Sequence, residues 1–395
     1  MNSKLVAALS SLTLLIAGCG GESSNDTTEQ DSSGTILTGI FIDSKVANIG
    51  YKTETQSGVT NNHGEFRYVA GENVSFSIGN LDLPTAKAKG VITPMTLAAH
   101  PSIYHETATN IAMLLQSLDE DGIAENGIRI AEGAAEAAPA EINFNSDSAS
   151  FSNNAAVINM VANSGAFKTE LITASDAQAH MQTSIDTLTP HIGAWSSVND
   201  NQASRLILLA NNTFIYAEND AELPNGVEFG TYSYDASRSE LTFDIQFDSN
   251  GPGEDSGVGD IGTPVTTDAH FSNNNSTLAI VGGAITLNAD TFSSSMEGLW
   301  SYRQGTAVFH LALYSDNTFL IVQSKDNAPQ GLQLGSYQYN SSTKEITLSR
   351  SFDDTEQGDS LGEGNELEDM MMALEVVNNH TLSLMNDGLI LSRSL

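Results

Sequence analysis

The chain has 395 residues, of which 40% are hydrophobic, and its 49 Asp and Glu outnumber 15 Lys and Arg, giving a formal net charge of −34. This acidity argues against nucleic acid as a partner and against electrostatic docking on anionic lipid, because both need a basic surface. The hydrophobic content is too high for a disordered polyanion, so we expect ordinary apolar cores beneath an acidic, solvated surface.

The N-terminal segment has the parts of an export signal. Lys4 supplies a positive start, and residues 5–16 form an apolar stretch shorter than the roughly 20 residues that span a bilayer. The segment ends in Leu15-Ile16-Ala17-Gly18-Cys19. This pattern resembles the lipobox of bacterial lipoproteins, which implies removal of residues 1–18 and acylation of the Cys19 thiol. Cys19 is also the only cysteine in the chain, so the sequence has no other thiol for a disulfide, a metal site or a nucleophile.

The residues that follow Cys19 predict a flexible tether and the membrane to which the protein is sorted. Gly20 comes next, which in lipoproteins of Gram-negative bacteria implies routing to the outer membrane, on a face that the sequence leaves open. Several acyl chains on one residue hold a protein stably at a membrane. Residues 20–34 contain no apolar side chain that could enter a core, so we expect a flexible acidic tether over residues 19–34. No later segment is long and apolar enough for a second membrane span.

Residues 35–93 have the pattern of strands and tight turns. Residues 36–42 form an apolar run, residues 74–78 alternate, and Gly79-Asn80 predicts a two-residue hairpin loop. The string from Gly39 through Phe41-Ile-Asp-Ser to His63-Gly-Glu-Phe-x-Tyr68 resembles carboxypeptidase-regulatory-like and transthyretin-like domains. It is also similar to the front module of marine bacterial surface lipoproteins and adhesin-like proteins. The resemblance implies a β-sandwich and informs fold more than function.

The middle of the chain, residues 94–192, has a helical pattern and is predicted to be a connector. Helix patterns occupy residues 110–118, 154–163 and 175–188. Thr107 or Thr109 is expected to cap the first of these helices, and Gly122 is expected to stop it. The Ala- and Glu-rich residues 131–140 fit either a helix or a linker.

The remainder is a tandem repeat, with copies at residues 193–297 and 298–395. Trp195 of Gly-Ala-Trp matches Trp300 of Gly-Leu-Trp at an offset of 105, the difference between 300 and 195. The same offset relates Asn212-Thr-Phe214 to Asn317-Thr-Phe319, Gly230-Thr-Tyr-Ser-Tyr234 to Gly335-Ser-Tyr-Gln-Tyr339, and Phe247-Asp248 to Phe352-Asp353. A match held over a domain length indicates duplication. Each copy is predicted to form about eight short antiparallel strands, as a meander barrel or a sandwich, within a mainly β chain.

Two local features of the repeats predict strand geometry. Asn211-Asn212 and Asp316-Asn317 lie between apolar strands, where a type I′ hairpin turn favours residues that tolerate positive φ. The apolar alternation changes parity at Gly230 and again at Gly335, which predicts a β-bulge at each glycine. The Gly-x-Trp opening of each copy resembles that of lipocalin-like barrels.

One candidate cation site follows the first predicted helix. Asp119, Asp121 and Asn126 supply oxygen ligands around Gly122, as Ca²⁺ prefers. The segment departs from the EF-hand pattern, because Ile123 occupies the fifth position and no bidentate Glu ends a twelve-residue loop. The alternative interpretation is an ordinary turn after a helix C-terminus.

A second candidate cation site is duplicated. Acidic, Gly-rich loops follow the Phe-Asp pair in both repeats, and a divalent cation would relieve the repulsion between their carboxylates. The candidate ligands are Asp248, Asp255 and Asp260 in the first copy and Asp353, Asp354 and Asp359 in the second. The alternative interpretation is a solvated surface loop.

The sequence carries no motif that predicts catalysis. It has no Gly-x-Ser-x-Gly, no His-Glu-x-x-His, no P-loop and no Gly-x-Gly-x-x-Gly following a strand, and its eight histidines are scattered. We therefore expect a non-enzymatic outer-membrane lipoprotein of adhesin or surface-interaction type, with a protein or polysaccharide partner. A lipocalin-like carrier of a small apolar ligand and a glycan hydrolase remain alternatives. Barrels with ligand-sized cavities would favour the carrier, and filled barrels the interaction protein.

Overall fold

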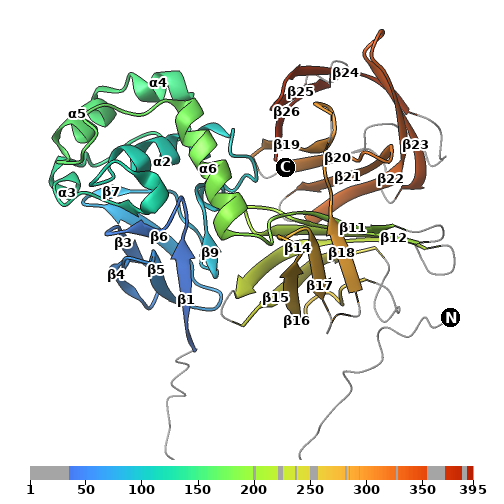
Figure 1. Ribbon diagram of the computed structural model, residues 1–395, viewed down its shortest axis with the longest axis horizontal. Coiled ribbons are helices and arrows are strands. Elements are labelled where there is room, and N and C mark those ends of the chain that lie inside the picture. The colour runs from blue at the N-terminus through green and yellow to red at the C-terminus, as the bar shows by residue number, and fades with distance from the viewer. Residues whose placement is uncertain are drawn as a thin grey trace, which may run out of the picture.

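A computed structural model describes three parts of the chain, an N-terminal lobe (the N-lobe) and two β-barrels (Figure 1). The described residues are 35–198, 202–220, 226–235, 238–249, 257–280, 283, 285–292, 294–305, 307–325, 328–353, 370–384 and 389–394. The architecture is mainly β, with helices between the first strands and the barrels, and this confirms the predicted fold class. Among these residues, no helix has the length and the apolar composition that crossing a membrane requires.

The N-lobe combines small sheets with short helices. Its strands are β1 (Ile36–Phe41), β2 (Val46–Ala47), β3 (Gly50–Lys52), β4 (Ser57–Val59), β5 (Glu65–Val69), β6 (Asn73–Ile78), β7 (Leu81–Asp82), β8 (Ala86–Lys87), β9 (Val91–Ile92) and β10 (Ile128–Arg129). Its helices are α1 (Pro94–Ala98), α2 (Glu106–Ser117), α3 (Ala134–Ala137), α4 (Ser148–Ser152), α5 (Ala155–Asn163) and α6 (Ala174–Leu188), with a 3₁₀ turn, η1, at Ala124–Asn126. One sheet has the order β5-β1-β9, and another has the order β4-β3-β6-β7 with β8 on β6.

Aromatic side chains join these two sheets of the N-lobe. The ring of Phe41 stacks on that of Phe76 at 4.4 Å, and Phe66 meets Phe76 edge-on at 5.4 Å. A Cβ on Gly39 would lie 2.4 Å from the Phe66 ring, so the glycine is needed for this packing. The buried residues of α2, α5 and α6 belong to the same hydrophobic cluster. Strands and helices of the N-lobe therefore share one core.

The predicted helices occur at the expected positions, but the predicted start of α2 was wrong. The structure confirms α5 and α6, and Gly79-Asn80 joins β6 to β7 as predicted. The predicted cap of α2 was wrong, because the helix begins at Glu106 after His105, which makes no side-chain capping bond. The threonine hydroxyls are used elsewhere: Thr107 donates to Asn145 Oδ1 at 2.7 Å, and Thr109 donates to the Ile103 carbonyl at 3.0 Å. The helix ends at Ser117, before Gly122.

A buried acid in the N-lobe core makes stability depend on pH. Asp43 is 1% exposed, and Gln116 Nε2 donates to its two carboxyl oxygens at 3.1 and 3.0 Å. Burial raises the pKa of Asp43 from 3.8 to about 7. The neutral acid is favoured in the folded state, so its stabilising contribution is complete below pH 3.8 and is lost as the pH rises towards 7.

We therefore expect Asp43→Asn to flatten the pH dependence of stability. The unfolding free energy of the parent protein should include a fall of up to about 1.4 kcal/mol per pH unit across this window, and the variant should lose that component. Urea unfolding at pH 4, 5.5 and 7 measures the slope, with the exposed Asp82→Asn as the matched control. Equal slopes in the parent and in Asp43→Asn would show that folding does not raise the pKa of Asp43.

The two repeats form two closed eight-stranded barrels with the same strand order. Barrel 1 consists of β11 (Gly193–Val198), β12 (Gln202–Leu208), β13 (Thr213–Asp220), β14 (Gly226–Asp235), β15 (Glu240–Asp248), β16 (Val265–Ser272), β17 (Thr277–Ile280) and β18 (Ile285–Ala289). Barrel 2 consists of β19 (Gly298–Gln304), β20 (Ala307–Leu313), β21 (Thr318–Lys325), β22 (Ala328–Asn340), β23 (Glu345–Asp353), β24 (Met370–Asn378), β25 (Thr381–Leu384) and β26 (Leu389–Arg393). All neighbouring strands are antiparallel, so the predicted duplication of one meander fold is confirmed.

Equivalent large side chains fill both barrels. The cluster inside barrel 1 includes Trp195, Phe214, Tyr232 and Phe243, and the cluster inside barrel 2 includes Trp300, Phe319, Tyr337 and Leu348. Their polar atoms are satisfied in the same way in both repeats. The indole N–H groups of Trp195 and Trp300 donate to carbonyls four residues upstream, at 3.1 and 2.8 Å. The hydroxyls of Tyr232 and Tyr337 both donate to carbonyls at 2.9 Å.

The glycine bulges are confirmed, and the hairpin type was wrong. The register shifts between Phe229 and Gly230 in barrel 1 and between Leu334 and Gly335 in barrel 2. Only the second residue of each predicted turn, Asn212 or Asn317, has a positive φ, at 66° and 62°. A type I′ turn needs two such residues. The backbone N–H of each asparagine donates to the carbonyl three residues earlier, as in a type I turn followed by one left-handed residue.

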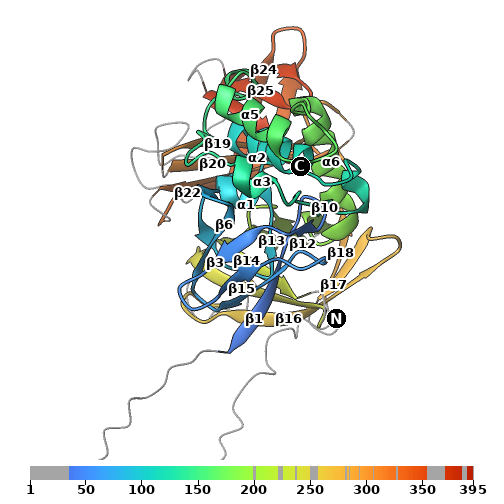
Figure 2. The same cartoon turned by 90° about the vertical axis from the view of Figure 1, so that its left-hand side faces the viewer.

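The three parts contact one another pairwise, and the N-lobe lies across both barrels (Figure 2). The β12–β13 hairpin of barrel 1 meets the N-lobe, where Thr93 Oγ1 donates to the Ala210 carbonyl at 2.9 Å and Asn212 Nδ2 donates to the Val91 carbonyl at 3.1 Å. Tyr104 of the N-lobe stacks on His380 of barrel 2 at 4.4 Å. A separate apolar cluster, which includes Leu299 and Leu320 of barrel 2, joins the two barrels.

Candidate functional site

The structure brings together the three residues predicted for the first cation site. They lie in a loop between α2 and β10 that includes η1. Asp119 is 1% exposed, pairs with Ile130 in an isolated β-bridge, and accepts the Arg129 backbone N–H on Oδ1 at 2.9 Å. Asp121 is exposed and accepts two hydrogen bonds at 2.9 Å, from the Ile123 backbone and from the Asn126 amide group. Hydrogen bonds from two backbone N–H groups and from the Asn126 side chain therefore hold the two carboxyl groups in place.

The two carboxyl groups of this loop lie within hydrogen-bonding reach of each other. Asp119 Oδ2 is buried and has no hydrogen-bond partner among the described residues. Burial raises the pKa of Asp119, whereas the Asn126 side chain and the Ile123 N–H lower the pKa of Asp121. Burial therefore favours the neutral form of Asp119, whereas the hydrogen bonds of Asp121 favour its ionised form.

A lysine that sequence reasoning missed supplies positive charge to this loop. Lys168 Nζ donates to the Gly122 carbonyl at 2.5 Å, and its charge lowers the pKa of both aspartates. The neighbouring Phe167 ring packs on Gly122, which has a φ of +74°. Nothing local in the sequence connects residues 167–168 with residues 119–126, so only the fold could reveal the contact.

The second predicted cation site is only partly within the described residues. Asp248 is the cross-strand partner of Glu228 in barrel 1, and Asp260 is exposed in the loop before β16. Cys19, Asp255, Asp354 and Asp359 lie outside the described residues. Within the described ranges, no group of three or more His, Cys, Asp or Glu side chains is arranged to hold a metal ion.

Glu228 is an acidic residue of barrel 1 that the sequence analysis did not single out. It is fully buried, and its Oε1 accepts the Val258 backbone N–H at 2.7 Å. Its Oε2 has no hydrogen-bond partner among the described residues. Burial raises the pKa of Glu228 to about 8, and the charges of Asp248 and Glu218 act in the same direction.

Barrel 2 does not repeat this acidic arrangement. At the offset of 105, Gln333 stands in place of Glu228 and Gln323 in place of Glu218. Asp353 is the cross-strand partner of Gln333, as Asp248 is of Glu228. The acidic pairing is therefore a property of barrel 1, although the surrounding strands are duplicated.

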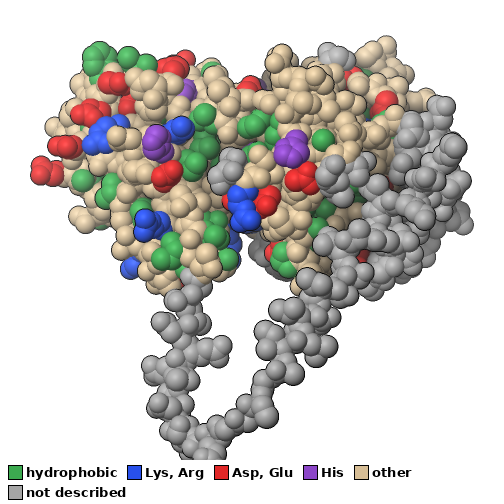
Figure 3. Space-filling model, turned by 60° about the horizontal axis from the view of Figure 1, so that its bottom comes forward, with side chains coloured by type: hydrophobic (Ala, Val, Ile, Leu, Met, Phe, Trp, Pro, Cys, Tyr) green, Lys and Arg blue, Asp and Glu red, His purple; other side chains and the backbone are tan. Residues whose placement is uncertain are grey.

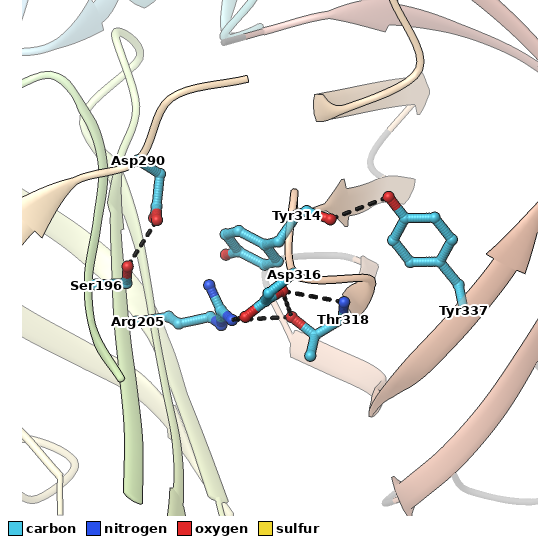
Figure 4. A network of polar contacts seen from close by, with 7 residues as sticks. All are labelled: Ser196, Arg205, Asp290, Tyr314, Asp316, Thr318 and Tyr337. Carbon is cyan, nitrogen blue, oxygen red and sulfur yellow. Dashed lines mark hydrogen bonds and ion pairs between the residues drawn. The ribbon is translucent and has the colours of Figure 1, made fainter. Parts of the chain in front are cut away.

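A polar network joins the two barrels (Figure 4). Arg205 on β12 forms an ion pair with Asp316 in the β20–β21 hairpin and donates to Thr318 Oγ1 at 2.8 Å. Its guanidinium lies 3.8 Å from the centre of the Tyr314 ring. Ser196 donates to Asp290 at 2.6 Å beside it. Because the Arg205 side chain is only 10% exposed and its Nη2 bonds residues of the other barrel, this network joins the two barrels.

The corresponding face of barrel 2 contacts the N-lobe instead. Ser301 and His310 take the places of Ser196 and Arg205 at the offset of 105, and Ser301 Oγ lies 2.7 Å from His310 Nδ1. Both side chains are buried, and burial lowers the pKa of His310 to about 4. Beside them, Arg303 donates to the Ala99 carbonyl at 2.7 Å. This Ser–His pair is packed within an interface and does not line an open cleft.

Two hollows lie outside the barrel interiors. One, of about 260 Å³, lies between the barrels and is lined by residues that include Arg205, Glu218 and Ser336. The other, of about 230 Å³, lies where α6 leads into β11 and is lined by residues that include Asp186 and Asp290. Both linings include charged side chains, which do not suit a small apolar ligand.

Comparison with known proteins does not assign the chain to a family. No model of a known protein family matches it, and no curated protein sequence is similar to it. The fold and the geometry of its sites therefore carry the functional argument.

Proposed function

We propose that this chain is a lipid-anchored protein of the bacterial cell envelope that works as a non-enzymatic interaction protein at the outer membrane. The lipobox-like segment with the only cysteine, followed by an acidic tether, supports the anchor. The filled barrels support interaction over transport. Their interiors hold packed aromatic and aliphatic side chains where a carrier of lipocalin type would hold its ligand.

The polar contacts of the structure are consistent with a scaffold. Arg205, Ser301 and His310 carry groups that also occur in catalytic sites, but Arg205 bonds the other barrel, and Ser301 and His310 are buried and lie within hydrogen-bonding distance of each other. On the face shown in Figure 3, Asp and Glu side chains of the N-lobe are scattered singly over the surface. Such a surface suits solubility and a protein or polysaccharide partner rather than a polyanion.

Replacing Cys19 by serine tests the anchor. The serine hydroxyl is not the thioether-forming group that lipoprotein maturation needs, so we expect loss of acylation and loss of the mature, membrane-retained form. The measurement is metabolic labelling with a fatty acid in a Gram-negative host, combined with membrane fractionation. Ser23→Ala, a little further along the predicted tether, is the matched control and should behave as the parent. Labelling and membrane retention that both survive in Cys19→Ser would refute the anchor.

A further inference from the structure

The loop at residues 119–126 contains a carboxyl oxygen for which the loop supplies no hydrogen-bond donor. Asp119 Oδ2 is buried without a donor among the described residues, and the Asp119 carboxyl group lies within hydrogen-bonding reach of that of Asp121. Two facing carboxyl groups are stable when a proton or a cation lies between them. Asp119 Oδ1, by contrast, accepts the Arg129 N–H, so Oδ2 is the oxygen that is left for a ligand.

The groups around this oxygen are hard ligands. Asp121, the side-chain amide of Asn126 and the Gly122 carbonyl lie in the same turn, and Asp121 and Asn126 are exposed, so an ion can enter from solvent. Carboxylate, amide and carbonyl oxygens with water are the usual ligands of Ca²⁺. The β-bridge from Asp119 to Ile130 and the left-handed Gly122 hold the turn in shape without an ion.

We propose that residues 119–126 form a calcium site of modest affinity, in which Ca²⁺ competes with the ammonium group of Lys168. Asp119 and Asp121 provide the charged ligands. Asn126, whose amide nitrogen donates to Asp121 in the ion-free loop, provides a neutral oxygen once this amide turns over, and Gly122 provides another once Lys168 leaves its carbonyl. With only two carboxylates, the site belongs with weak extracellular-type sites, whose Kd is on the order of 10⁻⁴–10⁻³ M. The inference is independent of the lipid anchor and of the interaction role.

Competition between Ca²⁺ and Lys168 predicts opposite effects of two substitutions on Ca²⁺ affinity, whereas nonspecific screening of the acidic surface by salt does not. Removing the Asp119 charge should weaken Ca²⁺ binding, whereas removing the Lys168 charge should strengthen it. Lys87 offers a matched control, because its Nζ also donates to a glycine carbonyl, that of Gly71 at 3.1 Å, away from any paired aspartates described here. Asp82, exposed on β7, is the control for loss of one acidic charge.

The experiment is a calorimetric titration of the full chain in detergent with CaCl₂, against NaCl of equal ionic strength. We expect Asp119→Asn to weaken binding about tenfold or more, and Lys168→Met to tighten it about fivefold. Lys87→Met and Asp82→Asn should bind as the parent does. Because the Asp119→Asn side chain keeps an oxygen for the Arg129 N–H and removes the repulsion, this variant should melt no lower than the parent when both are free of calcium.

Three results would overturn the site. The first is no saturable Ca²⁺ binding beyond the NaCl control. The second is unchanged affinity in Asp119→Asn, which would place the ion elsewhere, for example at the acidic loops after Asp248 and Asp353. The third is a Lys168→Met variant that binds no more tightly than Lys87→Met.

Discussion

Replacing Trp300 by alanine is expected to lower the unfolding free energy by about 3–5 kcal/mol. The indole is fully buried in barrel 2, donates to the Met296 carbonyl at 2.8 Å, and lies under the Arg393 guanidinium at 4.5 Å. Alanine leaves a cavity where the ring packed and removes the donor from the Met296 carbonyl.

Fluorescence is suited to this measurement, because Trp195 and Trp300 are the only tryptophans in the chain. Trp195 then reports on barrel 1 alone in the Trp300→Ala variant, while circular dichroism follows both barrels. Trp300→Phe keeps most of the buried volume and should cost less than Trp300→Ala. A denaturation midpoint for Trp300→Ala equal to that of the parent would contradict the placement of this ring in the barrel core.

Replacing Gly335 by alanine is expected to destabilise barrel 2 by about 3 kcal/mol, near the upper end for overpacking. A Cβ at this bulge would lie 2.0 Å from the Ser349 carbonyl oxygen and 2.9 Å from Arg350 Cα. Both atoms belong to the backbone of the paired strand, so no side-chain rotation relieves the clash. The equivalent Gly230 is equally confined, with a Cβ 2.1 Å from the Asp244 carbonyl oxygen, and Gly230→Ala should have a similar effect.

Gly305→Ala separates this clash from the general cost of losing a glycine. Gly305 has a φ of +62° and no atom within 4 Å of an added Cβ. Alanine there should cost only about 1–2 kcal/mol, for the left-handed backbone. Urea unfolding of the three variants provides the comparison. If Gly335→Ala were no less stable than Gly305→Ala, the bulge would not require a glycine.

The duplicated fold could be predicted because its signals are local and repeated. The change of parity at Gly230 and Gly335 marked the bulges, and the offset of 105 between Trp195 and Trp300 marked the two barrels. Finer geometry depends on distant contacts. The cap of α2 was wrong because the Thr107 and Thr109 hydroxyls bond to other segments. The turn type was wrong because Asn tolerates positive φ without requiring it at both positions.

The candidate sites divide in the same way. Asp119, Asp121 and Asn126 are close in sequence, so their proximity in one loop could be predicted. Lys168 and the pairing of Glu228 with Asp248 depend on tertiary contacts and left no pattern in the sequence. The offset of 105 shows in the sequence that Gln333 of the second copy replaces Glu228 of the first. Only the structure shows that both positions are buried, which makes the difference in charge important.

Duplication also explains how the molecule is assembled. Equivalent outer faces of the two barrels make different contacts. Arg205 of barrel 1 bonds the β20–β21 hairpin of barrel 2, whereas His310, at the equivalent position of barrel 2, is buried near the N-lobe. The β12–β13 hairpin of barrel 1 contacts the N-lobe in turn. Each of the three parts therefore contacts the other two, and the side chains on the shared face differ between the copies.

Native mass spectrometry of the protein extracted from bacterial membranes tests the lipid anchor and the filled barrels together. We predict a chain that begins at Cys19, carries acyl groups on that residue, and holds no small apolar ligand in either barrel. A chain that keeps residues 1–18, a mature chain without acyl groups, or a stoichiometric apolar ligand that survives extraction would contradict the proposed function.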